Sequence, residues 1–181
     1  IPNTECYGAS ILGWKNVATS RDCDDRERAS RRCFELLQEM ITAFHRTTVV
    51  TIKPSIEHYN HVLEALTVSK KSKAFHQAQQ LLEDLGGQSA SGVITRSNEN
   101  ANSTELQPNA QTYLLVLSVL RNSRIPRKIE NAKQILARFK SSADDLKSRS
   151  TKESMVGAIS AFIPVCAKEG STKEDSQKMD I

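Results

Sequence analysis

The chain has 181 residues, of which 38% are apolar and 5% aromatic, and its formal net charge at pH 7 is +4. No stretch approaches the roughly 18 consecutive apolar residues that a membrane-spanning helix needs, so we expect no membrane partner. With one Trp, three Tyr and five Phe, the core must consist mostly of Leu, Ile, Val and Ala. This composition favours packed helices over a β-sandwich.

The chain ends and the cysteines bear on the cellular context. The sequence begins at Ile1, and neither end carries the pattern of a secretory signal, so we expect a section of a longer protein. The cysteines stand at irregular spacings, without a Cys-x-x-Cys pair, which favours a reducing compartment over a disulfide framework. They are Cys6, Cys23, Cys33 and Cys166.

Three segments share a pattern typical of the start of a helix. In each, a Pro is followed by an N-capping residue, and a Tyr comes five positions after the Pro. Apolar residues recur four and seven positions after the Tyr, which is the spacing of one helix face. The segments are Pro2–Tyr7, Pro54–Tyr59 and Pro108–Tyr113, with caps Asn3, Ser55 and Asn109 and apolar residues Ile11, Leu63, Leu117, Trp14, Leu66 and Leu120.

A second helical block follows each of these helices. A small residue comes first, two further apolar positions follow three and four residues later, and a large apolar residue stands at the seventh, as expected for a helix with one buried face. The blocks are Cys33–Met40, Ala78–Leu85 and Ala132–Phe139. The first unit is longer between its Tyr and its small residue than the other two, which predicts an inserted turn at Asp22–Asp25.

The repeats divide the chain into units. We assign residues 1–53 to repeat 1, residues 54–107 to repeat 2, residues 108–153 to repeat 3, and residues 154–181 to a truncated repeat 4. Within repeat 2, residues 86–107 are rich in Gly, Ser and Asn and have no periodicity, which is typical of a flexible linker.

These units resemble pentatricopeptide repeats. The first helix of that family opens Tyr-Asn-x-Leu/Val-x-x-Ala-Leu, and Tyr59–Leu66 follows this pattern; Ala78–Leu85 resembles the second helix, and Pro108-Asn109 the closing Pro-Asp/Asn. The resemblance implies an all-α fold, an α-solenoid of stacked helix-turn-helix repeats in a right-handed superhelix. It also implies a non-catalytic RNA-binding adaptor in RNA processing, stability or translation, located in a mitochondrion or plastid. The expanded turns are similar to those of algal and other protist members.

In that family one base of single-stranded RNA is read by the residue after the Tyr together with the residue after the closing Pro. The resemblance therefore pairs Gly8 with Ser55, Asn60 with Asn109, and Leu114 with a residue near Met155. The two asparagines match a combination that favours a pyrimidine in the family, and an amide offers both a donor and an acceptor to a base. Gly8 and Leu114 offer no polar side-chain atom.

Several of these features have a second interpretation. Asn109 is also a good N-cap, and Asn60 would also fit an exposed residue in the first turn of its helix. The basic turns at Lys70–Lys73 and Arg121–Lys128 suit either water or phosphate. Glu5 and Glu57 stand where the family has aliphatic residues that sandwich bases. Because carboxylates repel phosphate, they favour the alternative of a helical protein-interaction scaffold that binds no RNA.

Nothing in the sequence predicts an enzyme, a metal or a cofactor. A Gly-rich phosphate loop, a nucleophile elbow and a His-Glu-x-x-His motif are all missing from the sequence. His58, His61 and His76 could share a metal, but no fourth ligand stands at a defined spacing from them.

Overall fold

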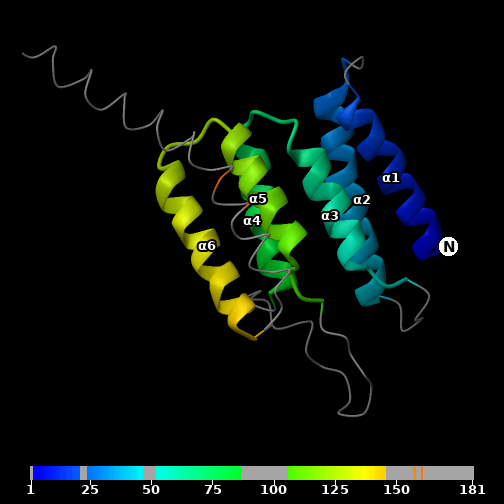
Figure 1. Ribbon diagram of the computed structural model, residues 1–181. Helices are drawn as coiled ribbons and strands as arrows, with labels where there is room; N and C mark the ends of the chain where they lie inside the picture. Colours follow the sequence, from blue (N-terminus) through cyan, green and yellow to red (C-terminus); the bar gives the residue numbers. More distant parts are fainter. Residues whose placement is uncertain are drawn as a thin grey trace, which may run out of the picture.

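A computed structural model describes residues 2–20, 24–46, 52–86 and 106–145, together with the single positions 157 and 160. In these ranges the regular secondary structure is helical and contains no strand, which confirms the all-α prediction. The helices are α1 (Thr4–Thr19), α2 (Arg26–Arg46), α3 (Ile56–Leu66), α4 (Ser72–Leu85), α5 (Ala110–Asn122) and α6 (Lys128–Asp145) (Figure 1).

The first helix of each pair begins where the caps predict. Asn3 Oδ1 accepts a hydrogen bond from the Cys6 backbone N–H at 2.9 Å. Asn109 Oδ1 does the same for the Thr112 N–H, also at 2.9 Å. Ser55 is the N-cap of α3. These bonds satisfy N–H groups of the first turn that have no carbonyl partner within the helix, so the predicted starts of α1, α3 and α5 are confirmed.

The apolar stripes form one continuous core. Every apolar residue predicted to face inward on the first helices is buried except Trp14, which is partly buried. On the second helices the predicted positions are buried except Leu136, which packs against the core from a half-buried position. Tyr59 and Tyr113 are also buried, and the Tyr113 ring stacks on Phe139 with a centroid distance of 4.8 Å. Tyr59 and Tyr113 therefore pack inside the core, whereas Tyr7 is half-buried.

The helices pack as successive hairpins. α3 contacts both helices of the preceding pair, α1 and α2, and α5 contacts both α3 and α4; α6 packs on α5. Figure 1 shows the pairs side by side in chain order, with α1, α3 and α5 running in the same direction. The N-terminal ends of these three helices therefore lie at one end of the molecule, and the turns within the hairpins lie at the other.

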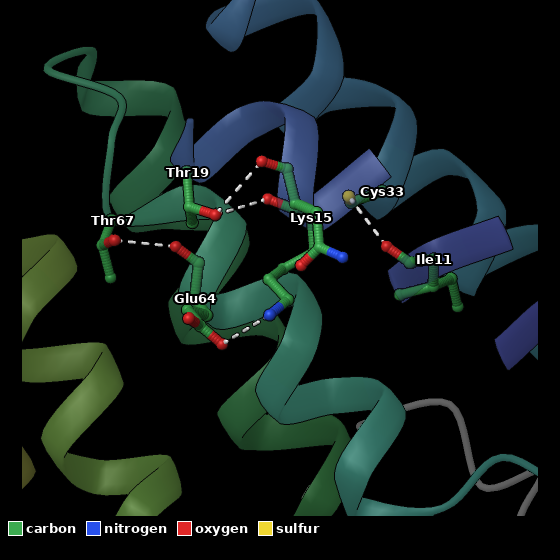
Figure 2. Close-up of polar contacts among 7 residues, drawn as sticks. Ile11, Lys15, Thr19, Cys33, Glu64 and Thr67 are labelled. Atoms are coloured by element: carbon green, nitrogen blue, oxygen red, sulfur yellow. Dashed lines mark hydrogen bonds and ion pairs between the residues drawn. The ribbon is translucent and has the colours of Figure 1, made fainter. Parts of the chain in front are cut away.

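Polar contacts join α1 to its neighbours (Figure 2). The Cys33 thiol on α2 donates to the Ile11 carbonyl oxygen at 3.6 Å, inside the core. Lys15 Nζ lies 3.6 Å from Glu64 Oε2 on α3, and the Lys15 side chain is only 15% exposed. Its aliphatic part thus packs between helices while its ammonium group reaches a carboxylate at the surface.

The first hairpin is longer than the second mainly because of its helices. α1 has 16 residues and α2 has 21, against 11 in α3 and 14 in α4. Asp24 and Asp25 form a turn before α2, whereas the rest of the predicted inserted turn, residues 22–23, lies outside the described residues. Residues 87–105 of the predicted linker at 86–107 and almost all of repeat 4 lie outside them as well.

α6 extends to Asp145, further than the predicted block at Ala132–Phe139.

No helix in the part of the chain that the structure describes has both the length and the apolar character needed to cross a membrane.

Candidate nucleic-acid interface

The predicted base-reading residues lie at the N-terminal ends of α3 and α5, where neighbouring first helices meet. In both places one side chain joins the two members of a predicted pair. That side chain belongs to the third helical residue after the N-cap. This residue directly precedes the Tyr of the repeat pattern. It is His58 on α3 and Thr112 on α5.

Thr112 joins Asn60 to Asn109. Its Oγ1 lies 2.8 Å from Asn60 Oδ1 and 2.9 Å from Asn109 Oδ1. The Asn109 backbone N–H also donates to Thr112 Oγ1 at 3.2 Å, and Thr112 is completely buried. A hydroxyl carries a single proton, so Thr112 donates to one of these two amide oxygens at a time and accepts from the backbone.

The two asparagines keep donors for a ligand. Asn109 is exposed and Asn60 is half-buried. Among the described residues, neither side-chain NH₂ group donates a hydrogen bond. Thr112 therefore fixes the oxygen side of the Asn60 amide and leaves its donors available. Donors held in this way suit acceptor atoms on the edge of a nucleic-acid base.

His58 joins Ser55 to Gly8. The Ser55 backbone N–H donates to His58 Nδ1 at 3.0 Å, and Ser55 Oγ lies 2.7 Å from the same nitrogen. On the other side of the ring, a Cβ built on Gly8 would lie 2.9 Å from His58 Nε2, closer than two such atoms can approach. Gly8 thus makes room for the imidazole, which gives a structural reason for a residue that the family pattern places at a base-reading position.

The environment of His58 favours the neutral ring. Partial burial lowers the pKa of His58 below its usual 6.5, and the neighbouring His61 lowers it further, while Glu57 acts in the opposite direction. Because Nδ1 accepts from the Ser55 N–H, the neutral ring carries its proton on Nε2. Protonation at Nδ1 would place two donors against each other and break this hydrogen bond.

The remaining predicted site residues differ in their surroundings. Leu114 is half-buried and packs against the core, and its predicted partner near Met155 lies outside the described residues. Glu5 and Glu57, which stand where the family has aliphatic residues, are exposed in the first turns of their helices. There the two carboxylates interact favourably with the helix dipoles, so they have a structural role apart from any contact with RNA.

The histidines considered as metal ligands do not converge with other ligating side chains. In the described ranges, no group of three or more His, Cys, Asp or Glu side chains is arranged to hold a metal ion. His58 is instead bonded to Ser55, and His76 is exposed on α4.

Sequence reasoning missed the role of Thr112 and took His58 only as a metal candidate. One available signal was the spacing of the capping box, in which the N-cap and the third helical residue bond to each other. Asn109 with Thr112 and Ser55 with His58 have this spacing. The spacing gives no information on the contacts of His58 with Gly8 and of Thr112 with Asn60. These contacts depend on how α3 packs on α1 and how α5 packs on α3.

Comparisons with known proteins place no constraint on this interface. No protein-family model, curated protein or solved structure matches the chain. The functional argument therefore depends on the repeat pattern and on the geometry of the two side-chain clusters.

Proposed function

We propose that the chain is part of a pentatricopeptide-repeat protein that binds single-stranded RNA. In this proposal the helical hairpins form an α-solenoid wound as a right-handed superhelix, with the first helices on its concave face. The packing of α3 on both helices of the preceding hairpin, and the same relation for α5, support this arrangement. The protein acts as a non-catalytic adaptor in RNA processing, stability or translation in a mitochondrion or plastid.

The observation that carries the proposal is the hydrogen bonding of Thr112 to Asn60 and Asn109. The two asparagines come from successive repeats and are 49 positions apart in the sequence, yet one buried hydroxyl contacts both side-chain oxygens. A pair of amides held at a helix–helix junction, with donors unused, is what reading of one base by two repeats requires. A cap alone would need Asn109 but not Asn60.

In the proposed complex, one base lies with its edge against Asn60 and Asn109. The amide donors bond to acceptors on that edge, such as the O2 and N3 atoms of cytosine or the O2 and O4 atoms of uracil. The corresponding Gly8 and Ser55 junction contributes no base reading, because His58 occupies the space between its two members. Binding by this chain is thus expected to be weak and to depend mainly on one junction.

The test is a fluorescence-anisotropy titration of the 181-residue chain with labelled ten-nucleotide RNAs of U, C or A at low salt. We expect binding to the pyrimidine RNAs that exceeds binding to the A oligomer and weakens as salt rises. If none of the RNAs binds at 20 mM salt, the proposal is wrong for this chain, and the protein-interaction scaffold becomes the better account.

A further inference from the structure

The turn end of the second and third hairpins carries a basic hollow, opposite the interface described above. It is shallow and open, and it forms where the turn between α3 and α4 meets the turn between α5 and α6. We call this surface the turn-end hollow; it is lined by Glu27, Lys70, Lys71, Ser72, Lys73 and Arg124. The proposed base-reading junction includes none of these residues.

The turn-end hollow has a clear excess of positive charge. Four of its lining residues are cationic and one, Glu27, is anionic, which leaves a formal charge of +3. Glu27 is paired with Lys71 and also lies 3.5 Å from Ser69 Oγ. Lys70, Lys73 and Arg124 are exposed, and none of them forms an ion pair with another described residue. Three cations therefore face the same space without an ion-pair partner of their own among the described residues.

Two hydrogen bonds hold the turns together and so fix the hollow. The Arg124 backbone N–H donates to the Lys70 carbonyl oxygen at 2.9 Å, and Asn122 Nδ2 donates to the Thr67 carbonyl oxygen at 2.7 Å. The geometry thus depends on backbone atoms and on Asn122, so the side chains of Lys73 and Arg124 remain free to contact a ligand.

The first turn of α4 opens into the same space. Its N-cap is Lys71, whose side chain cannot accept a hydrogen bond, and no side chain in the described ranges caps this helix. The Ala74 N–H donates to the Lys71 carbonyl oxygen at 3.2 Å, so the N–H groups of Ser72 and Lys73, with the positive end of the α4 dipole, add to the charge of the lysines. Cations together with uncapped helix N–H groups are a combination that suits phosphate oxygens.

We propose that the turn-end hollow binds a phosphate group, held by Lys70, Lys73, Arg124 and the first turn of α4. The phosphate belongs either to a nucleic-acid backbone or to a small phosphorylated compound. The site is distinct from the base-reading junction, since the two lie at opposite ends of α3, which by its 11 residues is about 16 Å long. The proposal therefore does not depend on the proposed function.

The experiment follows backbone amides of the full chain by ¹⁵N–¹H NMR during titration with pyrophosphate and, separately, with a ten-nucleotide U oligomer. We expect pyrophosphate to shift the amide signals of residues 70–73 and 124 in a saturable manner. The Lys73→Gln/Arg124→Gln variant should weaken this binding at least fivefold. The control variant, Lys133→Gln, removes an exposed lysine of α6 outside the hollow and should leave it unchanged.

The two ligands distinguish the source of the phosphate. If the nucleic-acid backbone is the ligand, the double variant also releases about one to two fewer counterions when it binds the U oligomer, as measured by a shallower slope of log K against log salt concentration. If a small compound is the ligand, pyrophosphate shifts these amides and the oligomer does not. The proposal fails if neither ligand shifts the amide signals of residues 70–73 and 124. It also fails if the Lys73→Gln/Arg124→Gln variant binds pyrophosphate as tightly as the unchanged chain does.

Glu27 provides a gain-of-function check. Glu27→Gln removes the single carboxylate of the turn-end hollow and frees Lys71, so pyrophosphate should bind two- to fivefold more tightly. Unchanged or weaker binding in a folded Glu27→Gln chain would contradict the electrostatic argument.

Discussion

His58 and Thr112 occupy the same position in successive repeats and solve the same packing problem with different chemistry. Thr112 is small, so the residue opposite it, Asn60, keeps a side chain that can accept its hydroxyl. His58 is large, so the residue opposite it is Gly8. The size of the third helical residue thus decides whether the preceding repeat has room for a side chain at the position after its Tyr.

The contact between Gly8 and His58 predicts an unusual result for a Gly→Ala change. Ala normally stabilises a helix interior by about 0.5–1 kcal/mol over Gly. Gly8→Ala should instead lower the free energy of unfolding by about 1–3 kcal/mol, because the new methyl group displaces an imidazole that Ser55 holds. Urea denaturation followed by circular dichroism measures the difference.

Gly13 on the same helix is the matched control. A Cβ there meets nothing within 4 Å, so Gly13→Ala should be neutral or stabilising. In a His58→Ala background, the cost of Gly8→Ala should disappear. Equal effects of Gly8→Ala and Gly13→Ala would show that His58 does not pack against Gly8.

The lowered pKa of His58 predicts acid sensitivity. Above pH 6.5 the ring is neutral in both states, so its contribution is complete. As the pH falls below 6.5, the unfolded chain binds the proton before the folded chain does, and stability declines. Denaturation at pH 7.5, 6.5 and 5.5 should show this loss, and His58→Gln should reduce it. An undiminished loss of stability in the His58→Gln chain would contradict this account.

The two free cysteines in the described part of the chain should differ in reactivity. Cys6 is exposed and Cys33 is buried, and burial raises the pKa of the Cys33 thiol to about 12. Since the thiolate is the reactive form, iodoacetamide at pH 8 should modify Cys6 and spare Cys33, as read by peptide mass spectrometry. In urea both should react. Equal native rates would contradict the burial of Cys33 between α1 and α2.

At the scale of the helices, the junction of α3 and α5 depends on the Thr112 hydroxyl. Thr112→Val keeps the shape but removes a group that contacts Asn60 and Asn109, and it should cost about 1–3 kcal/mol of stability. Thr112→Ser keeps the hydroxyl and should retain most of this stability. Thr42→Val, at an exposed position of α2, is the control and should stay within about 0.5 kcal/mol. A Thr112→Val cost as small as this control would mean that the hydroxyl does not join the helices.

The positions and types of the helices could be predicted from local sequence. The caps Asn3 and Asn109 act through bonds within one turn, and the stripe of Ala78, Leu81, Leu82 and Leu85 is a periodicity within one helix. Such features need no knowledge of the rest of the chain. The length of α1, which continues to Thr19, was not anticipated because its later residues lie outside the repeated pattern.

The junctions between helices could be predicted only in part. The family resemblance paired Asn60 with Asn109 and Gly8 with Ser55, but it gave no reason for one side chain to bridge the two members of each pair. Contact requires a particular register of α3 against α1 and α5, set by side chains along whole helices. Likewise, Lys70 and Arg124 were seen as two separate basic turns, and only the packing brings them to one hollow.

At the scale of the molecule, the low aromatic content now has an explanation. α3 and α5 each pack against the two helices before them, so the core extends along the row of hairpins and no single large centre is needed. Tyr113 on Phe139 is an aromatic pair within one hairpin. The two ends of the hairpins then offer separate surfaces, with amides at the helix starts and cations at the turns.

The central claim is that Asn60, held by Thr112, reads a base. The most direct measurement compares the unchanged chain, Asn60→Ala and the control Asn16→Ala, an exposed α1 asparagine, in titrations with U, C and A oligomers. Asn60→Ala should remove the preference for pyrimidines and weaken their binding about three- to tenfold, the equivalent of one hydrogen-bonding group, while Asn16→Ala has no effect. If Asn60→Ala binds the three RNAs as the unchanged chain does, the claim is wrong.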